Sequence, residues 1–290
     1  MTLDASTRAA VVAEVLTWYD ANARDLPWRA TDTTPWGVLV SEIMLQQTPV
    51  ARVLGPWQEW LARWPTPAAL AAEESSSAVA AWGRLGYPRR ARRLWQAAVA
   101  ITSTHGGEVP ADPEVLRTLP GVGEYTAAAV AAFAYGRRTL VLDTNVRRVL
   151  TRIELGEALP ATHLTAAERI RTEAWLPGEP ATAARWNVAA MELGALVCRA
   201  ASPDCNQCPV AEHCAWLAAG RPPYGGVRRS QAWHGTDRQC RGVLLAALRQ
   251  RPYDQTDLLA LWPDEAQSAR CLAGLVRDGL AQVEGDLVRL

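Results

Sequence analysis

Four of the six cysteines lie in one short stretch, CRAASPDCNQCPVAEHC, and they constrain the fold more than any other feature of the chain. Their spacing is C-x6-C-x2-C-x5-C, formed by Cys198, Cys205, Cys208 and Cys214. Structural zinc sites usually pair two short cysteine knuckles, whereas a single loop that carries all four ligands suits a cubane iron-sulfur cluster. The pattern therefore favours a 4Fe-4S cluster, with zinc as the alternative.

The expected compartment also favours a metal centre over disulfides. The N-terminal residues carry no apolar signal core, and no stretch approaches the roughly 18 uninterrupted apolar residues of a membrane span. We therefore expect a cytoplasmic protein with no membrane partner, in which disulfides are disfavoured. Cys240 and Cys271 lie at apolar-face spacing in predicted helices and are interpreted as small buried thiols.

Most of the chain is predicted to be helical. Ala-rich segments with apolar residues three and four positions apart recur between Pro and Gly breaks, and strand-like alternation is nearly absent before residue 280. With 290 residues, 49% of them hydrophobic, the chain can form two or three domains around sizeable cores. The sequence thus predicts an all-α protein.

The last part of the chain has a different pattern. Residues 218–231 are rich in Pro, Gly and Arg, and they are the best candidate for a linker. Beyond them the pattern predicts three helices followed by a hairpin around Gly285-Asp286. This order suggests a winged-helix module, and a small helical cap that binds no ligand is the alternative.

The segment EVLRTLPGVGEYTAAAVAAFAYG predicts a helix-hairpin-helix. A short helix runs into Leu119-Pro120-Gly121-Val122-Gly123, and a second helix follows from Glu124. The glycines permit a tight turn, whose amides can bind a phosphate together with the first amides of the second helix. Such a contact holds the DNA backbone and does not read its sequence.

Glu42 is a candidate general acid. It lies in SEIMLQQT, on a predicted helix whose neighbouring turns carry Val38, Leu39 and Leu45. Burial among these side chains would raise its pKa and keep a proton available near neutrality. An acid at the edge of an apolar face is an equally good interpretation of the local sequence.

Asp143 follows an apolar run and precedes the helix TNVRRVLTR, where it or Thr144 can serve as N-cap. Amide hydrogen bonds and the helix dipole both favour a carboxylate anion, so we expect Asp143 to be ionised while Glu42 is protonated. Cleavage of a glycosidic bond requires such a pair, because one group protonates the leaving group and the other stabilises the positive sugar.

The basic residues narrow the possible chemistry. The chain contains no lysine, so a Schiff base with a lysine amine is excluded. Thirty basic residues balance thirty acidic ones, and composition argues neither for nor against a nucleic-acid partner. The arginine runs within 84–93 and 147–152 are more typical of solvated faces than of binding sites.

Together these features resemble the helix-hairpin-helix DNA glycosylases with an iron-sulfur cluster, and within them the MutY-type adenine DNA glycosylases. The matching strings are RDLPWR, SEIMLQQT, LGYPRRARRL, LPGVGEYTA, LDTNVRRVL, ELGALVC and the cysteine loop, all in family order. The resemblance implies a monomer that binds duplex DNA, flips out adenine mispaired with 8-oxoguanine or guanine, and removes it. The short C-terminal part looks most like actinobacterial members.

The resemblance also implies a domain plan. Residues 1–28 and 139–220 would form an iron-sulfur cluster domain with the N-terminal helix. Residues 29–138 would form a six-helix barrel that carries the helix-hairpin-helix, and 221–290 the linker and winged-helix-like module. The adenine pocket would lie between the first two domains.

Site residues follow from the same resemblance. It implies that Glu42 protonates the adenine and that Asp143 stabilises the oxocarbenium ion, assisted by Tyr125 and Asn145. Related lyases carry a catalytic lysine at the position of Tyr125, so this chain is expected to hydrolyse the bond and stop at an abasic site. The residues expected to contact DNA are Leu45, Gln46, Gln47, Thr48, Gly86, Tyr87, Pro88, Arg24, Trp28, Leu119, Gly121, Val122 and Gly123.

Three departures from the family pattern bear on specificity. Pro88 stands where many members carry a second tyrosine, taken to wedge beside the damaged guanine, and Val188 replaces a polar residue that contacts adenine. The C-terminal part is also too short for the usual Nudix-like domain that reads 8-oxoguanine. A thymine or uracil mismatch glycosylase is an alternative function, because relatives of that specificity also carry a tyrosine at the position of Tyr125 and share the acidic pair. A non-catalytic DNA-binding protein is a second alternative.

Overall fold

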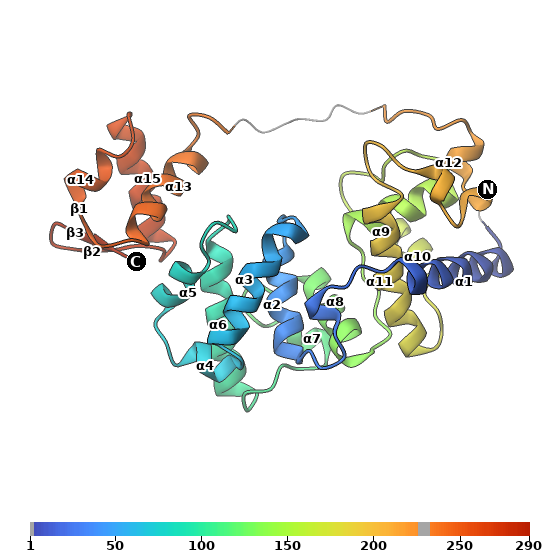
Figure 1. The fold of residues 1–290 in the computed structure, drawn as a ribbon, viewed down its shortest axis with the longest axis horizontal. Helices are drawn as coiled ribbons and strands as arrows, with labels where there is room; N and C mark the ends of the chain where they lie inside the picture. Colours follow the sequence, from blue (N-terminus) through green and yellow to red (C-terminus); the bar gives the residue numbers. More distant parts are fainter. Residues whose placement is uncertain (1–2, 226–232) are drawn as a thin grey trace. The chain divides into compact units, whose positions relative to one another are not determined.

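The computed structural model describes residues 3–225 and 233–290, and these residues are mostly helical, as predicted (Figure 1). They divide into two compact units. The first comprises Met1–Thr33, Ala111–Pro113 and Gly123–Val227, and the second comprises Thr34–Pro110, Glu114–Val122 and Arg228–Leu290. This division differs in part from the domain plan expected from the sequence, which stays a prediction.

The first unit is built around one apolar core. Its elements are α1 (Ala5–Asn22), η1 (Pro27–Arg29), α8 (Glu124–Tyr135), α9 (Thr144–Leu150), the π-helical turn η2 (Thr151–Leu155), α10 (Ala166–Glu173), α11 (Pro180–Leu196), η3 (Cys205–Gln207), η4 (Ala211–His213) and α12 (Ala215–Ala218). Val15 of α1, Val149 of α9 and Leu193 of α11 meet in the core. The chain on both sides of Asp143 is therefore held by packing from α1 and α11.

Six helices of the second unit precede the hairpin. They are α2 (Pro35–Leu45), α3 (Val50–Arg63), α4 (Pro67–Ala71), α5 (Ser75–Ala81), α6 (Arg89–Thr104) and α7 (Pro113–Leu116). Trp60 packs edge-on against Trp64 and Trp82, with ring centroids 4.6 and 5.6 Å apart. Helix α2 is buried from Trp36 to Met44, which accounts for its almost wholly apolar sequence.

The C-terminal part of the second unit has the predicted winged-helix order. It contains α13 (Asp237–Leu248), β1 (Tyr253–Asp254), α14 (Gln255–Leu259), α15 (Glu265–Arg277), β2 (Gln282–Glu284) and β3 (Leu287–Arg289). The predicted hairpin is confirmed, and β1 adds a third antiparallel strand to give the order β1-β3-β2. Cys240 and Cys271 are buried, as predicted. None of the helices in the described ranges is long and apolar enough to cross a membrane.

Candidate active site

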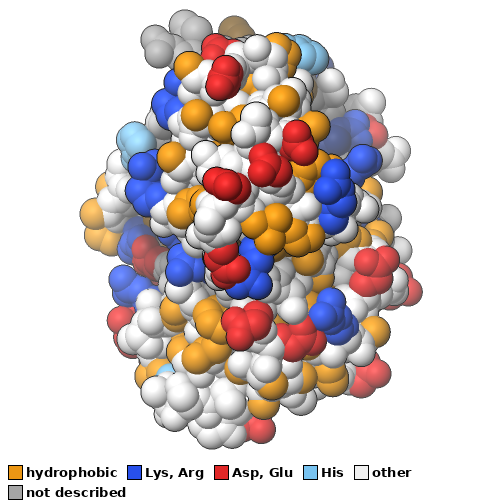
Figure 2. Space-filling view, turned by 90° about the vertical axis from the view of Figure 1, so that its left-hand side faces the viewer, with side chains coloured by type: hydrophobic (Ala, Val, Ile, Leu, Met, Phe, Trp, Pro, Cys, Tyr) orange, Lys and Arg blue, Asp and Glu red, His pale blue; other side chains and the backbone are white. Residues whose placement is uncertain are grey.

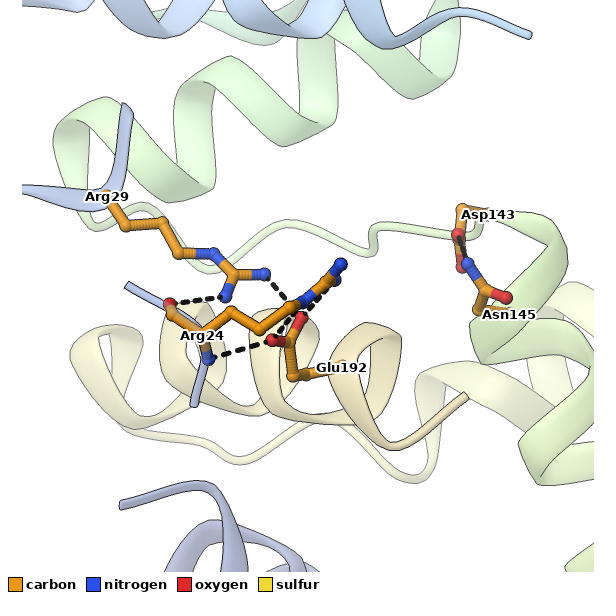
Figure 3. A network of polar contacts seen from close by, with 5 residues as sticks. All are labelled: Arg24, Arg29, Asp143, Asn145 and Glu192. Carbon is orange, nitrogen blue, oxygen red and sulfur yellow. Dashed lines mark hydrogen bonds and ion pairs between the residues drawn. The ribbon is translucent and has the colours of Figure 1, made fainter. Parts of the chain in front are cut away.

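Asp143 caps α9 at its N-terminus. Its Oδ1 accepts a hydrogen bond of 2.7 Å from the backbone N–H of Val146, and its Oδ2 accepts one of 2.7 Å from Nδ2 of Asn145 (Figure 3). The predicted capping role is therefore confirmed. Because each carboxylate oxygen has its own donor, the group is held in one orientation while the side chain stays partly exposed.

The pKa of Asp143 differs in direction from the sequence-based expectation. Withdrawal from water raises the pKa of this carboxyl above its ordinary value, and the hydrogen bonds from Val146 and Asn145 only oppose the rise. Asp4, the exposed N-cap of α1, shows what capping does alone, because the amide of Thr7 lowers its pKa. Burial therefore outweighs capping in its effect on the pKa of Asp143. The expectation that Asp143 is ionised stays a prediction.

A chain of hydrogen bonds connects Asp143 to the cysteine loop. Asn145, which donates to Asp143, accepts a 2.7 Å hydrogen bond from Nη2 of Arg148. The Nε of Arg148 donates in turn to the carbonyl of Cys198 at 2.8 Å. Arg152 of the π-helical turn also reaches Cys198, with Nη1 3.2 Å from Sγ. The orientation of the carboxylate thus depends on where the cysteine loop lies.

Close packing of α9 against α11 supports the same arrangement. A Cβ atom at Gly194 would lie 2.6 Å from Cβ of Asn145, closer than side chains approach one another. Only glycine therefore allows the first turn of α9 to rest on α11. The carbonyl of Gly194 also accepts a hydrogen bond of 2.7 Å from Nη2 of Arg148, which ties the two helices together.

Arg24 and Arg29 join the N-terminal segment to α11 through the buried side chain of Glu192. Oε1 of Glu192 accepts hydrogen bonds from Nε and the backbone N–H of Arg24, and Oε2 accepts from Nη2 of Arg24 and of Arg29 (Figure 3). Burial alone would raise the pKa of Glu192, but its bonds to the two arginines lower it to about 2. Glu192 is therefore ionised and fully paired.

This pairing bears on two predicted DNA contacts. The guanidinium of Arg24 is bound to Glu192, and one third of its side chain is exposed. Trp28 lies in η1 and is buried, so its ring is not presented as an exposed stacking surface. Both residues hold the fold of the first unit together. A contact of either with DNA stays a prediction.

Tyr125 and Asp143 lie on neighbouring segments of the first unit. Tyr125, in the first turn of α8, packs on a small buried cluster that includes Ala128 and Val141. Thr139 donates a 2.8 Å hydrogen bond to the carbonyl of Ala128, which fixes the segment leading to Asp143 against α8. Asp143 and Asn145 are therefore in direct contact, and Tyr125 lies on the helix that holds the segment leading to them. That Tyr125 shares a site with these two residues stays a prediction.

Glu42, the fourth predicted catalytic residue, lies in the second unit. It is 5% exposed in α2, between the buried side chains of Ser41 and Ile43. Burial of this acid, one of the two interpretations that its local sequence allowed, is confirmed. That Glu42 and Asp143 flank one pocket stays a prediction.

Arg90 connects two loops that are predicted to contact DNA. Its guanidinium is buried and donates to the carbonyls of Met44 at 2.9 Å and Gly86 at 3.0 Å, and to the hydroxyl of Thr48 at 2.9 Å. Burial lowers the pKa of Arg90 to about 10. Carbonyl oxygens at the C-terminal end of α2 favour a cation there through the helix dipole. Arg90 is therefore a structural cation that holds residues 45–48 next to residues 86–88.

Both loops contain strained backbone. Gln47 and Tyr87 have φ angles of +54° and +47°, a left-handed conformation that costs free energy for residues other than glycine. Both side chains are exposed. Strain that the surrounding structure maintains is typical of functional loops, and here Arg90 contacts the backbone of both loops.

The hairpin presents its backbone and not its side chains. Gly121 has φ +83°, and a Cβ there would meet Cβ of Arg93 at 2.9 Å, so the turn requires glycine. Leu119 and Val122 are buried, which restricts any contact they make with DNA to the backbone. Gly123 caps α8 with extended backbone and open space beside it, as approach of a phosphate to the helix amides requires.

The four cysteines of the loop line one cavity. Cys198, Cys205, Cys208 and Cys214 surround it together with apolar side chains such as Val149 and Leu193. Burial, together with the charges of the other three thiols, raises the pKa of Cys208 to about 12. Among residues 3–225 and 233–290, no three cysteine, histidine or acidic side chains converge closely enough to hold a single metal ion.

Sequence reasoning missed four residues that position the site. Each makes contacts with residues distant in the chain, and no local pattern distinguishes it from an ordinary helix residue. They are Arg90, Arg148, Glu192 and Gly194. All four lie within the strings that carry the family resemblance, LGYPRRARRL, LDTNVRRVL and ELGALVC, but these strings did not indicate the contacts.

Comparisons with known proteins identify relatives of this chain. Residues 40–174 match the HhH-GPD superfamily base excision DNA repair protein family. The adenine DNA glycosylase of Mycobacterium tuberculosis is 50% identical over 92% of this chain and 88% of its own. Because the alignment covers 92% of this chain, it includes part of the C-terminal module. The human adenine DNA glycosylase is 41% identical over 73% of this chain and 40% of its own. A thermostable thymine-DNA glycosylase structure aligns with 74% of this chain and all of its own, at 27% identity and a TM-score of 0.66.

Proposed function

Because this chain belongs to the adenine DNA glycosylase family of base excision repair enzymes, we propose that its substrate is adenine mispaired with 8-oxoguanine or guanine in duplex DNA. The family membership indicated by the motifs is confirmed, and the enzyme is a hydrolase that acts on N-glycosyl bonds. The observation that carries the proposal is the fixed carboxylate of Asp143, held by Val146 and Asn145 in a partly exposed position.

The two carboxyl groups have separate roles in the proposed reaction. Glu42, buried in α2, protonates the flipped adenine and makes it a better leaving group. Asp143 in its ionised form stabilises the positive charge that develops on the sugar. Asn145 orients that carboxylate, and Tyr125 assists from α8. Water then completes hydrolysis and leaves an abasic site. The absence of lysine from the chain supports a monofunctional enzyme, since no lysine Schiff base can form.

Release of labelled adenine tests this proposal. Under single-turnover conditions the protein is expected to release adenine from A:8-oxoguanine and A:G duplexes and to leave thymine in T:G untouched. Release of thymine in preference to adenine would instead make the chain a thymine-DNA glycosylase, as the thermostable relative is named.

Glu42→Gln is expected to slow adenine release about 10²–10⁴-fold, because the amide cannot donate the acid proton. The effect should appear in the single-turnover rate and leave duplex affinity close to that of wild type. Glu59→Gln, a change of the same kind at an exposed position of α3, is the control and should release adenine at the wild-type rate. Equal rates for wild type and Glu42→Gln would remove Glu42 from the mechanism.

We also propose that the cysteine loop holds a 4Fe-4S cluster. A single zinc ion needs four sulfurs around one point, whereas a cubane cluster keeps them apart around a common space. The four cysteines surround a common cavity, which supports the cluster. Bound there, the cluster would neutralise the thiolates and fix the carbonyl of Cys198 that Arg148 contacts.

Cys205→Ala is expected to remove most of the bound iron, the brown colour and much of the folded protein, because one of four ligands is lost. Iron analysis and visible absorbance measure this. Cys240→Ala is the matched control, since Cys240 is buried in α13 outside the loop and should keep its iron. Purified wild-type protein that is colourless and contains zinc would contradict the cluster proposal.

A further inference from the structure

The winged-helix module is attached to α6 of the same unit through Asp278. Its carboxylate, 9% exposed, accepts hydrogen bonds from Arg241 of α13 and, at 2.7 Å, from Nη2 of Arg89. Its carbonyl accepts a hydrogen bond of 3.0 Å from Nη1 of Arg92. At Gly279, with φ +65°, a Cβ would lie 2.6 Å from the guanidinium carbon of Arg92. Arg89 and Arg92 of the run RRARR therefore dock the module.

This docking places the start of α13 beside the loop at residues 86–88. The guanidinium of Arg238, in the first turn of α13, lies 4.6 Å from the ring centroid of Tyr87 and 5.3 Å from that of Trp233. The two rings are 39% and 47% exposed. An arginine and two aromatic rings thus form an exposed stacking surface, the kind of surface on which nucleic-acid bases stack.

Arg238 differs from the arginines that dock the module because its charge is not neutralised. Among the described residues, no carboxylate lies within ion-pair distance of Arg238, whereas Arg89 and Arg241 share Asp278. Figure 2 shows a face on which acidic and basic side chains are interspersed, so no field of one sign covers it. The guanidinium of Arg238 supplies several hydrogen-bond donors to a bound nucleic acid.

We propose that Arg238 contacts the purine opposite the target adenine, so that the C-terminal module contributes to recognition of the mispair. The proposal rests on the proposed function and on the expectation that the Tyr87 loop lies beside that base. A guanidinium donates well to O6 and N7 of guanine. In 8-oxoguanine N7 carries a hydrogen and becomes a donor, so the acceptors offered to Arg238 are O6 and O8. Tyr87 supplies a stacking face next to the donor.

Binding to duplexes that resist cleavage tests this role. The adenosine is replaced by its 2′-fluoro analogue, placed opposite 8-oxoguanine or opposite an abasic-site analogue, and Kd is measured for the full chain. Arg238→Ala is expected to raise Kd about tenfold opposite 8-oxoguanine, as for loss of one good base contact. Opposite the abasic analogue the change should stay below about threefold, because no base is there to contact.

A matched control and a second variant sharpen the test. Arg251→Ala removes the same kind of contact, an arginine 4.0 Å from the ring of Tyr253 in the same module, and should change neither Kd. Asp278→Asn weakens docking and should reproduce the selective loss of Arg238→Ala. Equal losses on both duplexes, or none, would overturn the proposal. Wild-type protein that releases no adenine would instead refute the proposed function itself.

Discussion

Replacing Glu192 by glutamine is expected to lower the free energy of unfolding by about 3 kcal/mol, near the lower limit for breaking a buried ion pair. Glu192 is fully buried and binds the guanidinium groups of Arg24 and Arg29. A neutral amide would leave two cations without their counter-charge and would turn donors toward donors. The loss stays near the lower limit because both arginines are partly exposed and regain some hydration.

The destabilisation should depend on pH in a defined direction. The pKa of Glu192 is about 2 in the folded protein, below its ordinary value, so the folded state favours the ionised form. Its contribution to stability is therefore complete above the ordinary glutamate pKa and is lost as pH falls toward 2. The difference between wild type and Glu192→Gln should be largest near neutrality and should shrink below about pH 5.

Denaturant unfolding, monitored by circular dichroism, measures both effects. Asp20→Asn is the matched control, because Asp20 forms an exposed ion pair with Arg185 that also joins α1 to α11. Asp20→Asn should lower the free energy of unfolding by less than about 1 kcal/mol. Equal losses in the free energy of unfolding for Glu192→Gln and Asp20→Asn would show that the buried ion pairs of Glu192 stabilise the fold no more than an exposed pair.

The sequence predicted the features of the fold that are determined by residues close together in the chain. The cap of α9 was predicted to be Asp143 or Thr144, and it is Asp143, because a cap is set by the residues that follow it within one turn. The winged-helix order followed from periodicity and a Gly-Asp turn, whereas β1 is two residues long and carries no detectable alternation. The four cysteines lie in one loop, so their spacing alone predicted that they share a site.

Contacts between distant segments were not predictable in this way. Glu192 and Arg24 are 168 positions apart, and the local sequence of neither residue indicates the other. Arg90 stands in a run of arginines that resembles a solvated face, yet the fold buries it under the carbonyls at the end of α2. The rise in the pKa of Asp143 was not predictable for the same reason, because packing of distant segments determines how much water reaches it.

Asp143→Asn is expected to slow adenine release about 10²–10³-fold in single-turnover assays, because a neutral amide cannot stabilise the developing positive charge. The substitution keeps an oxygen to accept from the amide of Val146, so the cap of α9 survives. It loses the acceptor for Asn145, at a cost of about 1 kcal/mol. The variant should therefore fold and bind duplex DNA while failing in catalysis.

The pKa of Asp143 predicts how stability and rate vary with pH. Because burial raises this pKa in the folded state, the protonated carboxyl is favoured there, and the stability it contributes is lost as pH rises through the folded-state pKa. At neutral pH the ionised carboxyl therefore lowers the free energy of unfolding. Asp143→Asn removes this penalty, which offsets the loss of the hydrogen bond from Asn145. As pH is lowered, protonation of Asp143 should slow adenine release by the wild type, starting at a higher pH than for an ordinary aspartate. Asp143→Asn should not show this decrease.

Asp4→Asn provides the matched control for this variant. Asp4 caps α1 through a 2.7 Å hydrogen bond from Thr7, the same geometry as at Asp143, but it is exposed and its pKa is lowered. Its replacement should leave adenine release and the pH profile unchanged, because only the capping contact is shared. If Asp143→Asn behaved like Asp4→Asn, retaining near wild-type release, Asp143 would be a helix cap alone. If only Asp143→Asn loses adenine release, the same carboxylate both caps α9 and takes part in the reaction, since the hydrogen bonds that it accepts at the start of α9 also fix its orientation.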